Sequence, residues 1–314
     1  MEFKRDKNGY IKIVEGEITP QYSSDFRTWF YFEKDGERYF FKGSNQVTNV
    51  EYEVLAGYIA NQVGLNAVKY FPAVFVDKNG DILSGVVSKD FTNDGQCIRF
   101  NSNATQIFSK ITDSPNTIEN QMAQLEIFVK GMQQKYTGDI IFDKRKIQNE
   151  LFKMLIFDTF MLNTDRARRN IEFLAKKVAN NTYNIELAPI FDNSQIFATQ
   201  SLKNSMQILD CIENKKPVPK EIFEKTDFLL GLNQCMDFDS LTKKISQTSM
   251  LNPYIKFVIE KFKNLDIQAV ANKIKSENPN FEICETTLQI ASAILDGTIR
   301  QNPLFAKRKF AFEF

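Results

Sequence analysis

Hydrophobic and polar residues alternate with a period of two in the first part of the chain, as in strands that bury one face. A turn containing Asp35-Gly36 separates two of these segments, which predicts a hairpin. After the third segment the period becomes helical, and the predicted helix stops at Gly64. The expected strands cover residues 10–14, 28–32, 38–42, 71–76 and 82–87, and the expected helix covers residues 48–63.

Helical periods dominate after residue 117. The segment 144–162 has so little polar surface that it predicts a buried central helix. A hairpin is expected directly after it, from segments 171–175 and 183–188 around a polar turn. Further helices are expected at 118–132, 202–213, 220–231, 238–246, 253–263, 266–276 and 284–297.

The polar, turn-forming segment 88–96 separates the strand-rich part of the chain from the helix-rich part. We therefore predict an α+β fold with two lobes, for which 314 residues are sufficient. A β-rich N-lobe with one helix is expected over residues 1–90, and a mostly helical C-lobe over residues 91–314.

The charges of the chain almost balance, because 40 basic residues face 39 acidic ones. Such a chain lacks the basic surface that binds a phosphate backbone, so no direct nucleic-acid partner is expected. No apolar run is long enough to span a membrane, and the charged N-terminus carries no cleavable signal sequence. We expect a soluble protein of a reducing, cytoplasmic compartment.

The chain has no histidine, and its four cysteines are far apart. Hydrolases with a Ser–His or Cys–His pair are therefore excluded, as is any histidine general base. Without a Cys-x2-Cys pair, a zinc site is not expected either. Phosphoryl transfer remains possible, because it asks the protein mainly for positioning and charge neutralisation.

Three oxygen-bearing side chains follow the predicted buried helix. Asp165 and Asn170 lie five residues apart in the loop after it, and Asp192 follows the hairpin. Because a hairpin returns the chain to its own start, we expect these side chains to converge, and Mg²⁺ prefers such oxygen ligands. In kinases, residues of these types orient the acceptor hydroxyl and hold the metal. The motif alone also fits loop-capping and turn residues, so both interpretations stay open.

A kinase also needs a lysine on an N-lobe strand and a glutamate on the next helix. Lys42 ends the third predicted strand, and Glu51 and Glu53 lie in the first turns of the following helix. The alternative is that the lysine is simply solvated and that the acidic residues stabilise the helix by interacting with its dipole. The order of these features along the chain favours the kinase interpretation. As in a kinase, the chain has in turn a strand lysine, a helix glutamate, a polar hinge, a buried helix, Asp-x4-Asn, a hairpin and an Asp.

These motifs resemble those of the HipA-like serine/threonine kinases. The segments that carry the resemblance are Phe40-Phe41-Lys42, residues 49–65, Asn163-Thr164-Asp165-Arg166 to Asn170, and Leu187-Ala188-Pro189-Ile190-Phe191-Asp192. The resemblance implies a two-lobed kinase fold, ATP and Mg²⁺ as cofactors, and a protein substrate with a Ser or Thr acceptor. It also implies a bacterial cytoplasmic protein, and compact members of the family that enter other cells make export into host cells a further expectation.

The resemblance also assigns roles in a cleft between the lobes. It implies that Asp165 is the catalytic base, that Asn170 and Asp192 bind Mg²⁺, and that Lys42 binds the phosphates of ATP. Glu53 matches the partner of the lysine, because it lies 11 residues before the glycine that ends the helix. Its neighbour at position 51 remains a rival.

The nucleotide contacts complete the expected site. By the resemblance, the backbone of Val87 and Lys89 takes the adenine, and Asp90 lies near the ribose. The glycine-containing phosphate loop of the family is not evident in this chain, so Ser23 and Ser24 are expected to bind phosphate in its place.

Two features of the loop after the buried helix depart from the family or stay open. Ala167 stands where the family has histidine, so any contact of that ring is lost. The basic residues Arg166, Arg168 and Arg169 are expected to form a solvated face, with a contact to the γ-phosphate or to a phosphorylated segment as the alternative.

Together the motifs predict an ATP- and Mg²⁺-dependent protein serine/threonine kinase that also phosphorylates itself. A small-molecule or lipid kinase of the same fold is one alternative, and a catalytically dead nucleotide-binding scaffold is another. The sequence indicates neither the substrate protein nor the oligomeric state.

Overall fold

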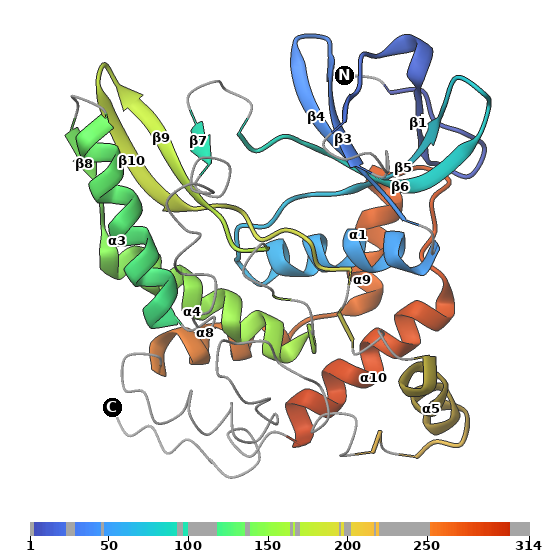
Figure 1. Ribbon diagram of the computed structural model, residues 1–314. Helices are drawn as coiled ribbons and strands as arrows, with labels where there is room; N and C mark the ends of the chain where they lie inside the picture. The colour runs from blue at the N-terminus through green and yellow to red at the C-terminus, as the bar shows by residue number, and fades with distance from the viewer. Residues whose placement is uncertain are drawn as a thin grey trace.

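The protein was analysed as a computed structural model. It describes residues 3–22, 29–44, 47–92, 97–99, 118–135, 139–163, 166, 170–194, 196–197, 202–216, 218–219 and 252–301. The helices expected at 220–231 and 238–246 lie outside these residues. In Figure 1 a β-rich part lies above a part that consists mainly of helices. The α+β fold is thus confirmed, while the division at residues 90 and 91 stays a prediction.

The β-rich part is one six-stranded sheet with the strand order β1-β5-β6-β4-β3-β2. Its strands are β1 (Ile11–Val14), β2 (Gln21–Tyr22), β3 (Trp29–Lys34), β4 (Glu37–Gly43), β5 (Phe71–Val76) and β6 (Ile82–Lys89), and a 3₁₀ turn at Glu15–Glu17 follows β1. Strand β1 is parallel to β5, and the other pairs are antiparallel. The sequence did not predict β2, because two residues are too few for a periodic pattern. The helix therefore follows the fourth strand rather than the third.

Alternation along β4 sends its side chains to two different faces of the sheet. Phe41 is fully buried and packs with Phe30 and Phe75. The ring centroids of Phe30 and Phe75 lie 4.7 Å apart. Lys42, the next residue, takes the opposite face. Aromatic packing on one face therefore fixes the strand and turns its lysine toward helix α1 (Val47–Gln62).

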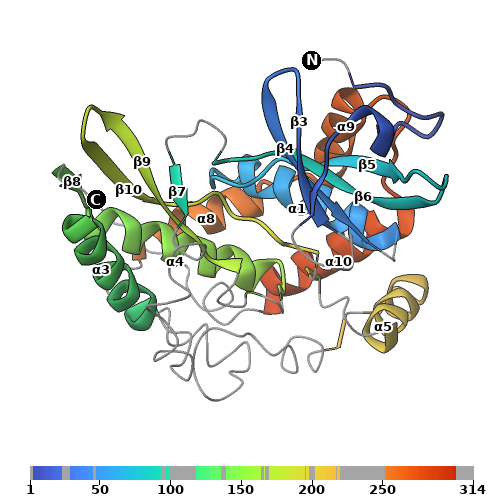
Figure 2. The same ribbon diagram turned by 45° about the horizontal axis from the view of Figure 1, so that its top comes forward.

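Helix α1 packs against the six-stranded sheet and against the helices α9 (Ile267–Glu277) and α10 (Glu285–Gln301). Both views show it between the sheet and α10 (Figures 1 and 2). It is buried on nearly all sides from Val50 onward, as expected of a helix that is covered all round. Gly64 ends it with a φ of +84°, a conformation that glycine adopts without strain.

The second sheet has the order β7-β9-β10-β8. Its strands are β7 (Cys97–Arg99), β8 (Asp139–Ile141), β9 (Phe173–Ala179) and β10 (Thr182–Leu187). Strands β9 and β10 form the expected hairpin. The flanking strands β7 and β8 were not predicted, because each has only three residues.

Helices make up the rest of the described chain. They are α3 (Ile118–Lys135), α4 (Lys144–Phe160), α5 (Leu202–Glu213) and α8 (Asn252–Lys263), besides α9 and α10. Phe160 near the end of α4 stacks on Phe262 of α8 at 4.7 Å, so the predicted central helix carries core side chains. Among the described residues no helix combines the length and the apolar character that a membrane span requires.

A short parallel bridge joins the segment after α1 to the segment after β10. Ala67 pairs with Ile190, whose carbonyl accepts a hydrogen bond from the Val68 N–H at 2.8 Å and whose N–H donates to Asn66 O at 2.8 Å. This bridge holds the chain just before Asp192 against the end of α1.

Candidate active site

Lys42, Glu53 and Asp192 meet between the six-stranded sheet, α1 and the segment after β10. The Lys42 Nζ lies 2.5 Å from Glu53 Oε1 and also forms an ion pair with Asp192 Oδ1. The side chain of Glu53 is 2% exposed, whereas those of Lys42 and Asp192 are each 27% exposed. The glutamate therefore anchors the lysine from the interior, and the other two charges stay within reach of a ligand.

The charges in this cluster shift one another's proton affinity. Burial alone would lower the pKa of Lys42, but the carboxylates of Glu53 and Asp192 outweigh it and raise that pKa. Burial raises the pKa of Glu53, and the nearby lysine opposes this rise. Burial and the charge of Glu53 likewise raise the pKa of Tyr70, which packs beside the cluster. Lys42 is therefore a permanent cation at neutral pH.

Glu51, the rival of Glu53, points to a different partner. Its carboxylate accepts a hydrogen bond from Thr287 Oγ1 at 2.5 Å and one from the Cys284 N–H at 3.2 Å, at the start of α10. The two glutamates thus leave α1 in different directions. Glu53 is the residue that the structure brings to Lys42.

Arg166 is not part of a solvated face, and this corrects the expectation from the sequence. Its side chain is 1% exposed, and its guanidinium pairs with Asp158 of α4 through Nε at 2.8 Å and through Nη2 at 3.0 Å. Burial alone would lower the pKa of Arg166, but the charge of Asp158 raises it. A buried guanidinium requires such a counter-ion, which is why the loop turns this arginine inward. Arg168 and Arg169 lie outside the described residues.

The remaining donors of Arg166 draw two parts of the site together. Nη1 donates to Asn170 O at 3.2 Å and to Phe191 O at 2.8 Å, and Nη2 donates to Asn193 Oδ1 at 2.5 Å. The end of the loop and the residue before Asp192 therefore share one guanidinium. This contact brings the backbone of Asn170 close to the residue before Asp192, while the convergence of the side chains of Asn170 and Asp192 stays a prediction.

Sequence reasoning missed Asp158 and Asn193. Asp158 is fully buried and also accepts a hydrogen bond from Asn163 Nδ2 at 2.8 Å. The Asn193 N–H donates to Glu53 Oε2 at 2.8 Å. The available signal for Asp158 was a carboxylate in the apolar second half of α4, because a buried charge demands a partner. Asn193 carried no such signal.

Asp192 has a φ of +56°, a left-handed conformation that is uncommon outside glycine but tolerated by aspartate. Such strain is often found at functional sites. Asp192 and the buried Asn170 supply the oxygen donors that Mg²⁺ prefers, and Mg²⁺ is usually held by one or two carboxylates together with substrate phosphates. The donor set of the described residues fits this ion.

The predicted hinge residues lie at the end of β6. Val87 is buried between Phe41 of β4 and Phe71 of β5, and Lys89 lies opposite Tyr39 alone. Because Tyr39 shares the aromatic face of β4, the Lys89 side chain points away from the face that carries Lys42. The adenine contacts at this backbone stay a prediction.

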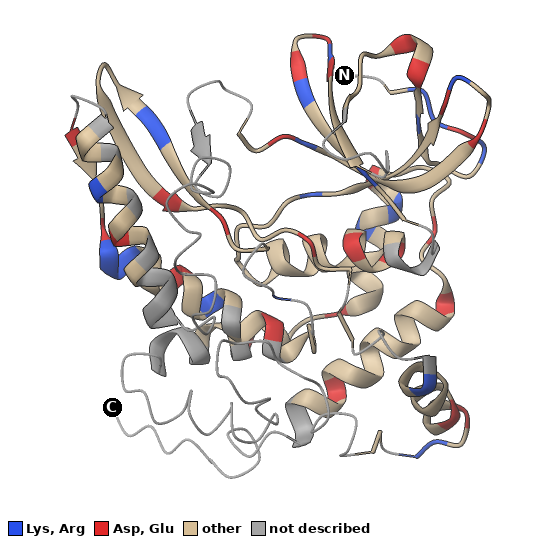
Figure 3. Ribbon diagram, in the orientation of Figure 1, with Lys and Arg blue, Asp and Glu red and all other residues tan. Residues whose placement is uncertain are grey.

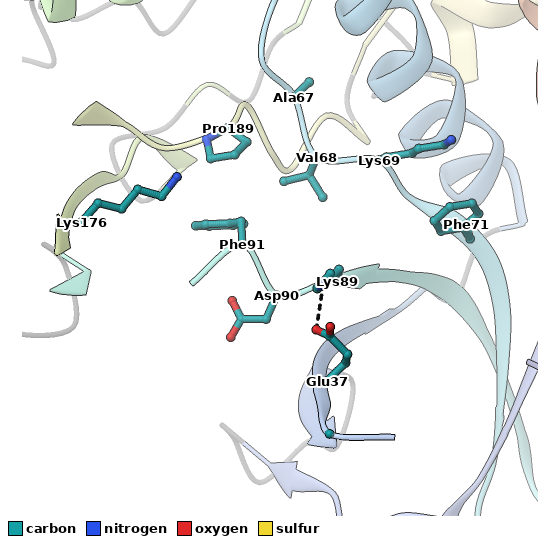
Figure 4. A pocket seen from close by; sticks show the side chains of 11 residues that line it. Glu37, Ala67, Val68, Lys69, Phe71, Lys89, Asp90, Phe91, Lys176 and Pro189 are labelled. Atoms are coloured by element: carbon teal, nitrogen blue, oxygen red, sulfur yellow. Dashed lines mark ion pairs between the residues drawn. The ribbon is translucent and has the colours of Figure 1, made fainter. Parts of the chain in front are cut away.

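A cavity of about 760 Å³ lies beside the hinge (Figure 4). Lys89 pairs there with Glu37 at 2.7 Å, and Phe91 and Pro189 face each other across it. Asp90 also borders the cavity, but its Oδ1 accepts hydrogen bonds from Thr92. The residues that line the cavity do not include Lys42, Glu53 or Asp192.

Three predicted site residues, Ser23, Ser24 and Asp165, lie outside the described residues. The strands on either side of the predicted phosphate loop are described, however. Trp29 begins β3 directly opposite Lys42 of β4. The first residue of β3 therefore lies at the lysine end of the sheet.

Solved structures of similar fold place this arrangement in context. The chain matches the proinflammatory kinase CtkA of Helicobacter pylori with a TM-score of 0.66 and 17% identity, over 93% of this chain and 95% of that chain. The chain has the fold of the HipA-like kinases. It also matches HipA of Shewanella oneidensis, solved with HipB and operator DNA, with a TM-score of 0.50 and 9% identity, over 91% of this chain and 63% of that chain. Neither protein-family models nor curated proteins match this sequence.

Proposed function

We propose that this protein is an ATP- and Mg²⁺-dependent serine/threonine kinase. The observation that carries the proposal is the position of Lys42, which is clamped between Glu53 of α1 and Asp192 of the segment after β10. A lysine held by a helix glutamate beside a metal-binding aspartate is the arrangement that kinases use for the phosphates of ATP. The likeness in fold to a Helicobacter pylori kinase supports the same conclusion.

Each residue has a defined task in this proposal. Lys42 neutralises the charge of the α- and β-phosphates, and Glu53 keeps the ammonium in place. Asn170 and Asp192 would hold Mg²⁺, which would neutralise negative charge on the phosphates of ATP. Asp165 orients the acceptor hydroxyl and accepts its proton.

In this proposal, nucleotide binding opens the ion pair between Lys42 and Asp192. When phosphate oxygens arrive, the lysine exchanges a carboxylate partner for a phosphate partner, and Asp192 becomes available to the metal. The intermediate exposure of both side chains permits this exchange without unpacking the core. Glu53 remains buried against the Asn193 N–H and does not have to move.

We propose protein serine or threonine hydroxyls, including those of the chain itself, as acceptors. Acidic and basic residues are interspersed along both sheets (Figure 3), so no strongly charged substrate is singled out. The absence of a nucleic-acid partner, the bacterial cytoplasm as location and export into host cells stay predictions.

The test is transfer of labelled γ-phosphate from ATP in the presence of Mg²⁺. The protein is incubated alone, with a generic protein acceptor, and with phosphoinositide vesicles. Label in protein supports the proposal, label only in lipid indicates a lipid kinase of the same fold, and no label with ATP still bound indicates a scaffold.

Lys42→Met should abolish phosphorylation, since it removes the cation at the centre of the site. Lys275→Met is the control, because Lys275 of α9 forms an exposed ion pair with Glu282 and does not line the cavity. Phosphorylation should fall at least about 100-fold in the first variant and stay unchanged in the second. Equal activity of Lys42→Met and the wild type contradicts the proposal.

A further inference from the structure

All five N–H donors of Arg166 have an acceptor in the structure. They reach both carboxylate oxygens of Asp158, the carbonyls of Asn170 and Phe191, and Asn193 Oδ1. The planar guanidinium fork fixes the relative positions of its partners as no other side chain can. Helix α4, the end of the loop at Asn170 and the more distant segment 191–193 therefore share one rigid group.

One of these partners extends the network to the lysine. Asn193 accepts a hydrogen bond from Arg166 through its side chain and donates one to Glu53 through its backbone N–H. Glu53 in turn holds Lys42. A continuous path of hydrogen bonds thus runs from α4 through the arginine to the cluster beneath the sheet.

We propose that Arg166, with Asp158 as its counter-ion, is the positioning residue that sets the metal-binding geometry of this site. Its Nη1 donates to the carbonyl of Asn170 and to the carbonyl of Phe191, the residue before Asp192. By holding both carbonyls, Arg166 sets the spacing of the metal ligands Asn170 and Asp192. This inference rests on the proposed kinase function. Arg166 touches neither nucleotide nor metal in this role.

The energetics of buried charges favour a positioning role over a purely stabilising one. Removing two charges from water offsets most of the attraction between them, so a buried ion pair contributes little net stability. What the pair does supply is a fixed geometry. Partners that orient metal ligands typically change metal affinity or activity about 10–100-fold when they are replaced.

Two sets of substitutions separate geometry from folding. Arg166→Lys keeps the positive charge beside Asp158 but offers three donors in place of the fork. The double variant Asp158→Asn with Arg166→Gln removes both charges together, so that no buried charge is left unpaired. Lys144→Gln is the control, because Lys144 lies on the same helix in an exposed pair with Glu126.

Two measurements, tryptophan fluorescence and amide hydrogen exchange, report the geometry of the site. The chain has a single tryptophan, Trp29, which is 39% exposed and lies opposite Lys42, so its fluorescence can report nucleotide binding and its Mg²⁺ dependence. Amide hydrogen exchange over residues 188–197 reports whether the Asn193 N–H is still held by Glu53, whatever the protein catalyses.

We expect exchange over residues 188–197 to rise at least tenfold in Arg166→Lys and in the double variant, but not in Lys144→Gln. The Mg²⁺ concentration for half-maximal nucleotide binding should also rise about tenfold. Unchanged exchange overturns the positioning role, and so does an unchanged Mg²⁺ requirement in a wild type that binds nucleotide. A wild type that neither binds ATP nor transfers phosphate overturns the proposed function instead, and the role in metal binding with it.

Discussion

Glu51 and Glu53 offer a matched pair of substitutions, since both are buried carboxylates on α1, two residues apart. Replacing each by glutamine keeps the size of the side chain and removes its charge. Glu51 accepts two hydrogen bonds at the start of α10. A bond to a charged group contributes about 1.5–3 kcal/mol and a neutral one about 0.5–1.5 kcal/mol. With two such bonds weakened, Glu51→Gln should lower the free energy of unfolding by about 2–3 kcal/mol.

Glu53→Gln should have the opposite effect, with little change in stability and a large loss of activity. Burial raises the pKa of Glu53, so removing its charge relieves a desolvation penalty, and the free energy of unfolding should change by less than about 1 kcal/mol. Lys42 then keeps Asp192 as its only carboxylate partner in the cluster, and the metal must compete for it. We expect phosphoryl transfer to fall about 100-fold, equivalent to about 2.7 kcal/mol of barrier.

The assay combines chemical denaturation with steady-state phosphorylation, on the wild type and both variants. The pattern we expect is a less stable but active Glu51→Gln protein and a stable but nearly inactive Glu53→Gln protein. The reverse pattern, with activity lost at Glu51 and kept at Glu53, refutes the assignment of the lysine partner.

Two further predictions follow from local packing and charge. A Cβ on Gly85 would lie 2.3 Å from the Lys42 carbonyl oxygen, so Gly85→Ala should shift β4, lower the free energy of unfolding by about 1–3 kcal/mol in denaturation experiments, and reduce activity. Equal stability of this variant would contradict the packing. Burial alone would raise the pKa of Glu277, but hydrogen bonds from Lys69 and Tyr58 lower it below the ordinary 4.5. Its stabilisation should thus be complete above pH 4.5 and disappear as the pH falls through the folded-state pKa. Glu277→Gln should then be less stable than the wild type at pH 7 and equal to it in strong acid, and a constant difference would contradict this.

Much of the fold could be predicted because its long elements bury one consistent face. Helix α5 begins and ends where its sequence pattern placed it, and the β9–β10 hairpin also lies where it was expected. The strands β2, β7 and β8 escaped prediction, because two or three residues cannot show a period. Such strands exist through their pairing partners, which the local sequence does not contain.

The candidate site was predictable where chemistry prescribes an order of residue types. That order named Lys42 and Asp192 and left Glu51 and Glu53 as candidates, of which the family resemblance favoured Glu53. The structure brings Lys42, Glu53 and Asp192 together. The inward turn of Arg166 was not predictable from its loop, because a run of basic residues ordinarily faces water. The signal lay elsewhere in the chain, in the buried carboxylate of Asp158.

The most direct test of the central claim is the rate of γ-phosphate transfer from Mg²⁺–ATP by the wild type and by Asp192→Asn, each at saturating nucleotide. Asparagine keeps the size of the side chain but removes the charge that pairs with Lys42 and that would bind the metal. The proposed function predicts transfer by the wild type and a loss of at least about 100-fold in the variant, partly recovered at high Mg²⁺. Equal rates, or no transfer by the wild type, would contradict it.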